Sequence, residues 1–95
     1  MNHYLSVRIS NPKQIVWEGE AESISSVNTQ GVFDILPEHA NFITYTENQP
    51  IIVRTKDKEV VEHIFKNSVI YVHENQVRVY TDLEWDCQIV KLLNC

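Results

Sequence analysis

Apolar and polar residues alternate along most of the chain, which is the pattern of β-strands that bury one face. The pattern begins at residues 4–9, where Leu5, Val7 and Ile9 share one face. Similar short segments follow at residues 22–27, 32–36, 42–45, 51–55, 60–65, 69–72 and 77–80. Polar stretches suited to hairpin turns separate several of them, at residues 48–50, 56–58 and 74–76. The sequence therefore predicts an all-β fold, an antiparallel β-sandwich or flattened barrel of about eight to ten short strands.

The last stretch, residues 83–95, departs from this alternation. Leu83, Val90 and Leu93 are spaced to form a short amphipathic helix, which we favour, whereas residues 88–93 are also compatible with an edge strand. The chain contains no repeat, low-complexity tract or linker. We therefore expect a single domain over residues 1–95.

Charge and composition exclude several classes of protein. The net charge is −5 and the eight Lys and Arg residues are dispersed, which argues against a nucleic-acid binder. The longest apolar run, residues 69–72, is too short to span a bilayer. Residues 1–4 lack the features of a signal peptide. We expect a cytoplasmic protein in which Cys87 and Cys95 are reduced.

Candidate catalytic chemistry is confined to one short segment. His39 follows Glu38, with Asp34 nearby, and such a group is compatible with acid–base catalysis. No Ser or Cys nucleophile has a recognisable spacing from them, so the preferred interpretation is a corner histidine that makes backbone hydrogen bonds or an interface contact. Histidines and cysteines lack zinc-site spacing, and the only glycines, Gly19 and Gly31, form no phosphate-binding loop. We predict no catalytic residue, metal or cofactor.

Two other features have a structural and a binding interpretation. Trp17 follows two apolar residues and precedes a glycine, so we expect it to fill the core rather than to stack on a sugar. Glu18, Glu20 and Glu22 alternate with small residues and would share one face of a strand. That face is either solvated or turned towards basic loops of a partner.

The most informative segment is Gly31–Ala40. Gly31 follows a polar stretch and marks a turn before a new strand. Val32 and Asp34 would point to one side of that strand, and the two apolar residues that alternate with them to the other. Pro37 cannot donate a ladder hydrogen bond, so the strand ends there or lies at a sheet edge.

This segment resembles the Gly-x-Leu/Phe-Gly-Ile-Leu/Tyr-Pro-Gly-His-Ala-Pro signature of the epsilon subunit of rotary F-type ATP synthases. The likeness extends over about residues 4–82 and includes segments that resemble the first strand with its Ser/Thr-Pro turn, the second strand and the last hairpin. Asp34 and Glu38 stand where the family commonly has glycine, and Asn41 stands where it has proline. Residues 66–68 replace a Ser-Gly-Gly turn, so we expect this loop either to have different backbone angles or to place Asn67 in the left-handed region.

The resemblance implies a β-sandwich that acts as a non-catalytic subunit of the central stalk, coupling ion-driven rotation of the c-ring to the gamma subunit and the catalytic head. It implies a peripheral location at the cytoplasmic side of an energy-transducing plasma membrane. The positions that match the c-ring contact are Gly31, Val32 and Phe33. The positions that match the gamma-subunit contact are Ser10, Asn11, His39 and Ala40. Val32 stands where a carboxylate is frequent in the family, so we expect a more apolar c-ring contact.

Many epsilon subunits continue into a C-terminal pair of helices that restrains ATP hydrolysis. The 95 residues end before such a pair, so the resemblance implies a form without this brake. Two alternatives stay open. The departures from the family pattern are compatible with a stand-alone β-sandwich adaptor derived from the epsilon fold. A small hydrolase or lyase using His39 and Glu38 is the other.

Overall fold

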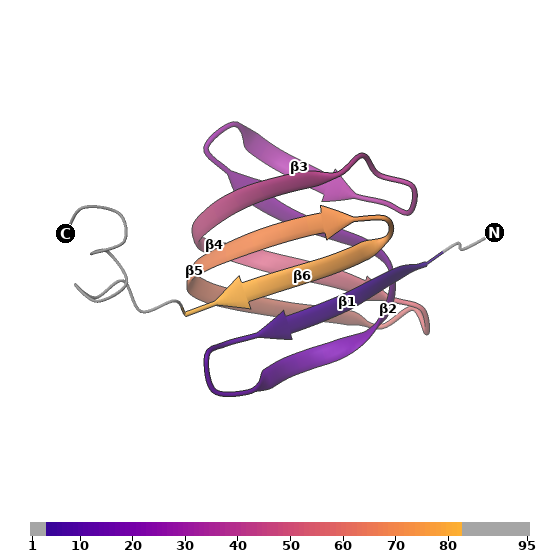
Figure 1. Cartoon of the computed structure of the whole chain (residues 1–95), viewed down its shortest axis with the longest axis horizontal. Helices are drawn as coiled ribbons and strands as arrows, with labels where there is room; N and C mark the ends of the chain where they lie inside the picture. Colours follow the sequence, from indigo (N-terminus) through magenta and orange to yellow (C-terminus); the bar gives the residue numbers. More distant parts are fainter. Residues whose placement is uncertain (1–3, 83–95) are drawn as a thin grey trace.

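The computed structural model describes residues 4–82, and these form a small all-β domain (Figure 1). Its strands are β1 (Leu5–Ser10), β2 (Ile15–Asn28), β3 (Gly31–Ile35), β4 (Phe42–Thr55), β5 (Val60–His73) and β6 (Gln76–Thr81). The predicted all-β class is confirmed. The helix or edge strand expected in residues 83–95, and both cysteines, lie outside the described residues.

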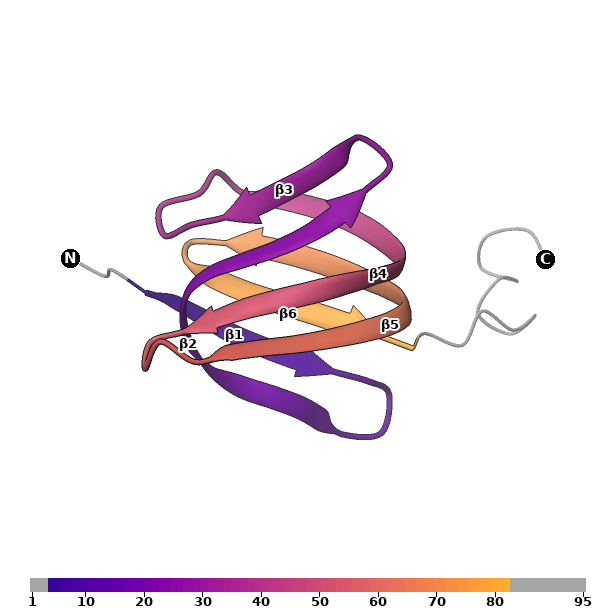
Figure 2. The ribbon, with the colours of Figure 1, turned by 180° about the vertical axis from the view of Figure 1, so that it is seen from behind.

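The strands form one sheet that closes on itself. The order is β1-β6-β5-β4-β2, and β2 pairs again with β1 to close the ring, while β3 extends the sheet beyond β2 (Figure 2). All pairs are antiparallel except β1 with β6, which is parallel, so the expectation of a wholly antiparallel sheet is wrong at this pair. β2 pairs with three strands: with β1 up to Ala21, with β4 from Ala21 to Ser25, and with β3 from Ile24 onwards. Its register with β4 shifts between Ala21 and Ser23.

The sheet contains fewer and longer strands than the eight to ten predicted. Its six strands include three of 14 residues, β2, β4 and β5, which run through predicted breaks. Residues 48–50 are not a hairpin tip and residues 66–68 are not a turn, because both lie inside paired strands. Asn67 is not among the residues with positive φ, whereas Asn48 has φ 54°.

These two stretches face each other and form a corner of the barrel. Glu47 pairs with Asn67 and Gln49 with Phe65. On β4 the buried positions change from even residues before the corner to odd residues after it, and β5 changes in the opposite order. Both strands therefore reverse their inward side at the same place. The turn-forming residues therefore lie where β4 and β5 bend together as a pair, and the chain does not reverse its direction there.

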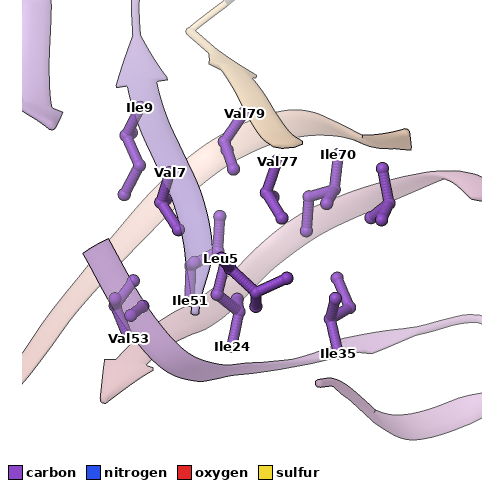
Figure 3. Packing of buried hydrophobic residues seen from close by; sticks show 12 residues of the cluster. Leu5, Val7, Ile9, Ile24, Ile35, Ile51, Val53, Ile70, Val77 and Val79 are labelled. Carbon is purple, nitrogen blue, oxygen red and sulfur yellow. The ribbon is translucent and has the colours of Figure 1, made fainter. Parts of the chain in front are cut away.

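Branched aliphatic side chains fill the interior of the ring (Figure 3). The apolar residues with no exposed surface in the described part of the chain are Leu5, Val7, Ile9, Ala21, Ile24, Ile35, Ile51, Val53, Ile70, Val72, Val77 and Val79. Every strand contributes at least one of them, so the core ties together all six strands. The predicted inward face of residues 4–9 is confirmed.

Trp17 packs half-buried against this core, as the sequence predicted. Its ring covers Gly19 on the same face of β2, and a Cβ atom at Gly19 would lie 3.0 Å from two ring carbons, Cη2 and Cζ2. Such a distance is shorter than a relaxed carbon–carbon contact. The glycine is therefore needed to seat the ring.

Replacing Gly19 by valine should displace the Trp17 ring and destabilise the domain by about 1–3 kcal/mol, the usual cost of overpacking. Urea unfolding and near-ultraviolet circular dichroism measure the two effects. Glu20→Val is the matched control, because Glu20 is exposed on the opposite face of the same strand. Equal unfolding midpoints for the two variants would contradict this account of Gly19.

The two predicted turns that do reverse the chain have the backbone geometry expected of them. Glu74 and Asn75 have φ of 47° and 65° in the connection between β5 and β6, the signature of a tight two-residue hairpin. Lys58 has φ 70° in the connection between β4 and β5. Asn75 also accepts a hydrogen bond from the Ser6 amide at 2.8 Å through its carbonyl, which joins this turn to the start of β1.

Candidate interaction surfaces

At the tip of the β2–β3 hairpin one apolar side chain is largely exposed to solvent. Gly31 has φ 117°, a backbone conformation open mainly to glycine. Val32 is 77% exposed, whereas Phe33 turns inward and packs edge-on against Phe42 with 5.6 Å between ring centroids. Asp34 is exposed as well, so the predicted alternation along this strand is confirmed.

The loop between β3 and β4 contains a structural histidine. The His39 amide donates to the Leu36 carbonyl at 3.1 Å, and the His39 Nδ1 atom lies 2.7 Å from the Ala40 carbonyl oxygen. The imidazole also packs against the ring of Phe42, with 5.5 Å between centroids. This is the corner histidine that the sequence analysis preferred.

The two neighbouring carboxylates have partners of their own. Glu38 accepts a hydrogen bond from the Asn75 side chain at 3.2 Å, and Asp34 accepts one from the Ser25 hydroxyl. Over residues 4–82 no hydrogen bond joins His39 to either carboxylate, and no cluster of potential metal ligands is found there. The geometry gives these residues structural roles and offers no support for a hydrolase or lyase.

The residues that depart from the epsilon signature around the β3–β4 loop all make hydrogen bonds. Glu38 has φ 68°, the left-handed conformation that a glycine would adopt easily, and its amide donates to the Asn75 side chain at 2.7 Å. Asn41 accepts a hydrogen bond from the Glu74 amide at 3.3 Å. Asp34 binds Ser25, whose hydroxyl also accepts a hydrogen bond from Arg54 at 2.8 Å. Each of these three side chains thus accepts a hydrogen bond from a neighbouring segment.

The first turn, where Ser10 and Asn11 lie, is held by its own side chains. The Asn11 carboxamide oxygen accepts hydrogen bonds from the Lys13 and Gln14 amides, both at 2.8 Å. The Ser10 carbonyl accepts one from the Thr81 hydroxyl at 3.3 Å. This turn and the loop with His39 lie at opposite ends of the domain (Figure 1). The four positions matched to a gamma contact are therefore not one cluster.

An exposed apolar surface lies between these ends, and the sequence analysis did not single it out. We call it the tyrosine face; its members are Ile43, Tyr45, Val69, Tyr71 and Tyr80. They point outward from β4, β5 and β6, and strand register places them side by side: Ile43 beside Tyr71, Tyr45 beside Val69, and Val69 beside Tyr80. Ile43 is 66% exposed, and the three tyrosines are exposed by 41, 40 and 45% in chain order.

The composition of the tyrosine face is that of a protein-binding surface. Contiguous exposed apolar patches mark interaction sites, and tyrosine is enriched in interfaces. Ile43, Tyr45 and Val69 also line a shallow apolar hollow. The signal in the sequence is a tyrosine at outward positions of three separate strands, but only the register shows that they meet.

The acidic positions of β2 form a solvated face with internal ion pairs. Glu18, Glu20 and Glu22 pair with Arg8, Lys56 and Lys58, respectively. The hydrogen bond and the negative charge of Glu22 raise the pKa of Lys58 above its ordinary value. Lys58 is charged near neutrality, and the small contribution of its raised pKa to stability is lost as the pH rises through that pKa. The positive charges that neutralise these three glutamates therefore come from the same chain.

The closed sheet and the exposed apolar side chains on its outer side define a small β-sandwich domain. No helix within residues 4–82 has the length and hydropathy needed to cross a bilayer. The chain belongs to the family described as the ATP synthase delta/epsilon chain β-sandwich domain, whose profile matches residues 4–83. The family resemblance drawn from the sequence is confirmed.

Individual relatives agree with this assignment. The chain is 31% identical over 78 residues to the ATP synthase epsilon chain of Sulfurimonas denitrificans, covering 82% of this chain and 60% of the relative. It is 29% identical over 80 residues to the epsilon chain of Leptospira borgpetersenii, covering 84% and 62%. The chain thus spans about three fifths of the length of these curated relatives.

Solved structures share the fold. A chain of the Euglena gracilis mitochondrial ATP synthase, in a structure of its OSCP/F1/c-ring assembly, superposes with a TM-score of 0.80 at 10% identity, covering 98% of this chain and 62% of that one. A chain from the central stalk and c-ring of the Tetrahymena thermophila mitochondrial enzyme gives 0.69 at 15% identity, covering 92% and 69%. At these identities the likeness establishes the fold alone.

Proposed function

We propose that this chain is a non-catalytic subunit of the central stalk of an F-type ATP synthase, which couples ion-driven rotation of the c-ring to the gamma subunit and the catalytic head. It would lie peripherally at the cytoplasmic side of the energy-transducing plasma membrane. Membership of the delta/epsilon family supports the class of complex. The tyrosine face is the observation that carries the proposal, because a rotor subunit without chemistry of its own needs a large surface for a neighbour.

The gamma contact would run along the tyrosine face. Ser10 lies beside Tyr80 in the parallel β1–β6 pair, and the loop with His39 and Ala40 leads directly into β4 before Ile43. The face thereby connects the two ends that contain the matched positions. One partner surface laid across it would contact Ser10 and Asn11 at one end and His39 and Ala40 at the other.

The c-ring contact would be the hairpin tip at Gly31, Val32 and Phe33. Val32 is the most exposed large apolar side chain of the described residues, and Phe33 fixes the tip to the body of the domain. A close-packed closed sheet resists deformation, so force applied at the tip would reach the tyrosine face with little loss. This arrangement suits a mechanical coupling element.

Replacing Val32 by aspartate should weaken retention of the c-ring, because an apolar contact would have to desolvate a carboxylate. We expect about a tenfold loss of c subunit recovered per mole of tagged chain, the equivalent of roughly 1.4 kcal/mol. Gln30→Asp, at an exposed neighbouring position, is the control. Undiminished recovery with Val32→Asp would argue against an apolar tip contact.

The proposed function is tested by isolating the tagged full chain from its native membranes in mild detergent and identifying its partners by mass spectrometry. The proposal predicts recovery of gamma, the alpha and beta subunits and c subunits. Recovery of none of them, from membranes shown to contain intact ATP synthase, would contradict it. Stoichiometric recovery of unrelated proteins instead would favour the stand-alone adaptor.

A further inference from the structure

One charged side chain that borders the tyrosine face, Arg78, has no counter-ion among residues 4–82. Arg78 of β6 lies beside Tyr71 on one side and beside Arg8 of β1 on the other. Arg8 is neutralised by Glu18, with 2.6 Å between its Nε atom and the carboxylate. Of these two neighbouring arginines, Arg8 therefore has an acidic partner and Arg78 has none within residues 4–82.

The contacts of Arg78 are all with neutral oxygen atoms. Its Nη1 atom donates to the Ser6 and Val77 carbonyls at 3.2 Å, and its Nη2 atom donates to the Gln76 side chain at 3.4 Å. In the described part of the chain no carboxylate lies within 4.0 Å of this guanidinium. A guanidinium has five N–H donors, so Arg78 keeps donors for a further acceptor.

Covering the tyrosine face would remove water from this half-buried cation. A desolvated charge without a counter-charge is costly, and a carboxylate is the acceptor that matches the guanidinium fork in shape and charge. The whole chain carries a net charge of −5, so the rest of its surface would on average repel an acidic partner surface. Arg78 is thus a local exception on an acidic molecule.

We propose that the partner surface that covers the tyrosine face presents a carboxylate to Arg78, and that this ion pair fixes the docking register. The inference rests on the proposed function, since it takes the gamma subunit as the occupant. Tyr71 and Tyr80 supply the apolar contact around the pair, and Arg78 selects the partner by charge. Removing one member of a desolvated pair leaves the other unpaired, so the effect falls mainly on the dissociation rate.

Binding of the purified gamma subunit from the same organism to the full chain provides the first test. Arg78→Gln should raise the dissociation constant at least about tenfold and should reduce the weakening of binding by salt. Arg54→Gln is the matched control, because Arg54 also donates to neutral groups, the Ser23 and Ser25 hydroxyls, but outside the tyrosine face. Both variants are compared with the unaltered chain for thermal unfolding.

Zero-length cross-linking provides a second test that needs no loss of binding. In the Arg78→Lys variant a carbodiimide should join the lysine Nζ to a gamma carboxylate as an amide, with loss of water taken up by the reagent. Peptide mass spectrometry should find this adduct, and Arg54→Lys should give none. Unchanged affinity and salt dependence in Arg78→Gln, with no adduct in a chain that still binds gamma, would overturn the inference and leave the proposed function intact. Failure of the unaltered chain to bind gamma would overturn both.

Discussion

Replacing Ile43 by aspartate should release this chain from the gamma subunit while leaving its fold intact. Ile43 is 66% exposed and lies beside Tyr71 on the tyrosine face. A carboxylate there would have to be buried in an apolar contact, which costs about 2 kcal/mol or more. We expect the dissociation constant to rise by about thirtyfold or more. Titration of the purified gamma subunit measures it.

The chain offers a closely matched control for this substitution. Ile64 is 69% exposed on β5, beyond the corner that separates the two halves of the β4–β5 pair. Ile64→Asp should therefore leave gamma binding unchanged. Each variant should unfold within about 0.5 kcal/mol of the unaltered chain, because neither side chain belongs to the core. Equal weakening by both variants would show that the tyrosine face is not the gamma contact.

Replacing Ile70 by alanine should cause the largest loss of stability among single truncations of this strand. Ile70 has no exposed surface and lies between β4 and β6, beside Thr44 and Val79. Truncation removes buried methyl groups and leaves a cavity, which costs about 2–5 kcal/mol. A domain of this size has only about 5–15 kcal/mol of stability in total. Urea unfolding of the purified chain gives the change directly.

The same strand supplies the control for the core variant. Ile64→Ala removes the same atoms from an exposed position, so its unfolding free energy should change by no more than about 0.5 kcal/mol. If Ile70→Ala were no more destabilising than Ile64→Ala, the inward side of β5 after the corner would be assigned wrongly.

The fold was predictable where local pattern and tertiary structure agree. Leu5, Val7 and Ile9 alternate without interruption, and their strand was found with its correct inward face. Residues 48–50 and 66–68 were wrongly predicted to be turns, because turn-forming residues also suit a sharp bend within a strand. A bend and a chain reversal differ in their pairing partners, which are set by distant residues.

The interaction surfaces, too, were predictable only where they depend on local pattern and not on the pairing of distant strands. The alternation that sets Val32 and Asp34 on one side of β3 was predicted correctly from five residues, and the structure shows that this side is exposed. The tyrosine face needed the register of β4, β5 and β6 as well as the parallel pairing that sets Ser10 beside Tyr80. Residues so far apart in the chain cannot be placed together by periodicity alone. The lack of a counter-ion for Arg78 within residues 4–82 likewise follows from its neighbours on the adjacent strands, Tyr71 and Arg8.

Site-specific photo-cross-linking within the native membrane complex tests the central claim most directly. A photoreactive phenylalanine analogue at position 32 samples the hairpin tip, and one at position 45 samples the tyrosine face; position 64 serves as the control. The rotor account predicts an adduct with the c subunit from position 32, an adduct with gamma from position 45, and neither from position 64. Adducts from positions 32 and 45 with other proteins only, in membranes that contain the assembled synthase, would contradict it.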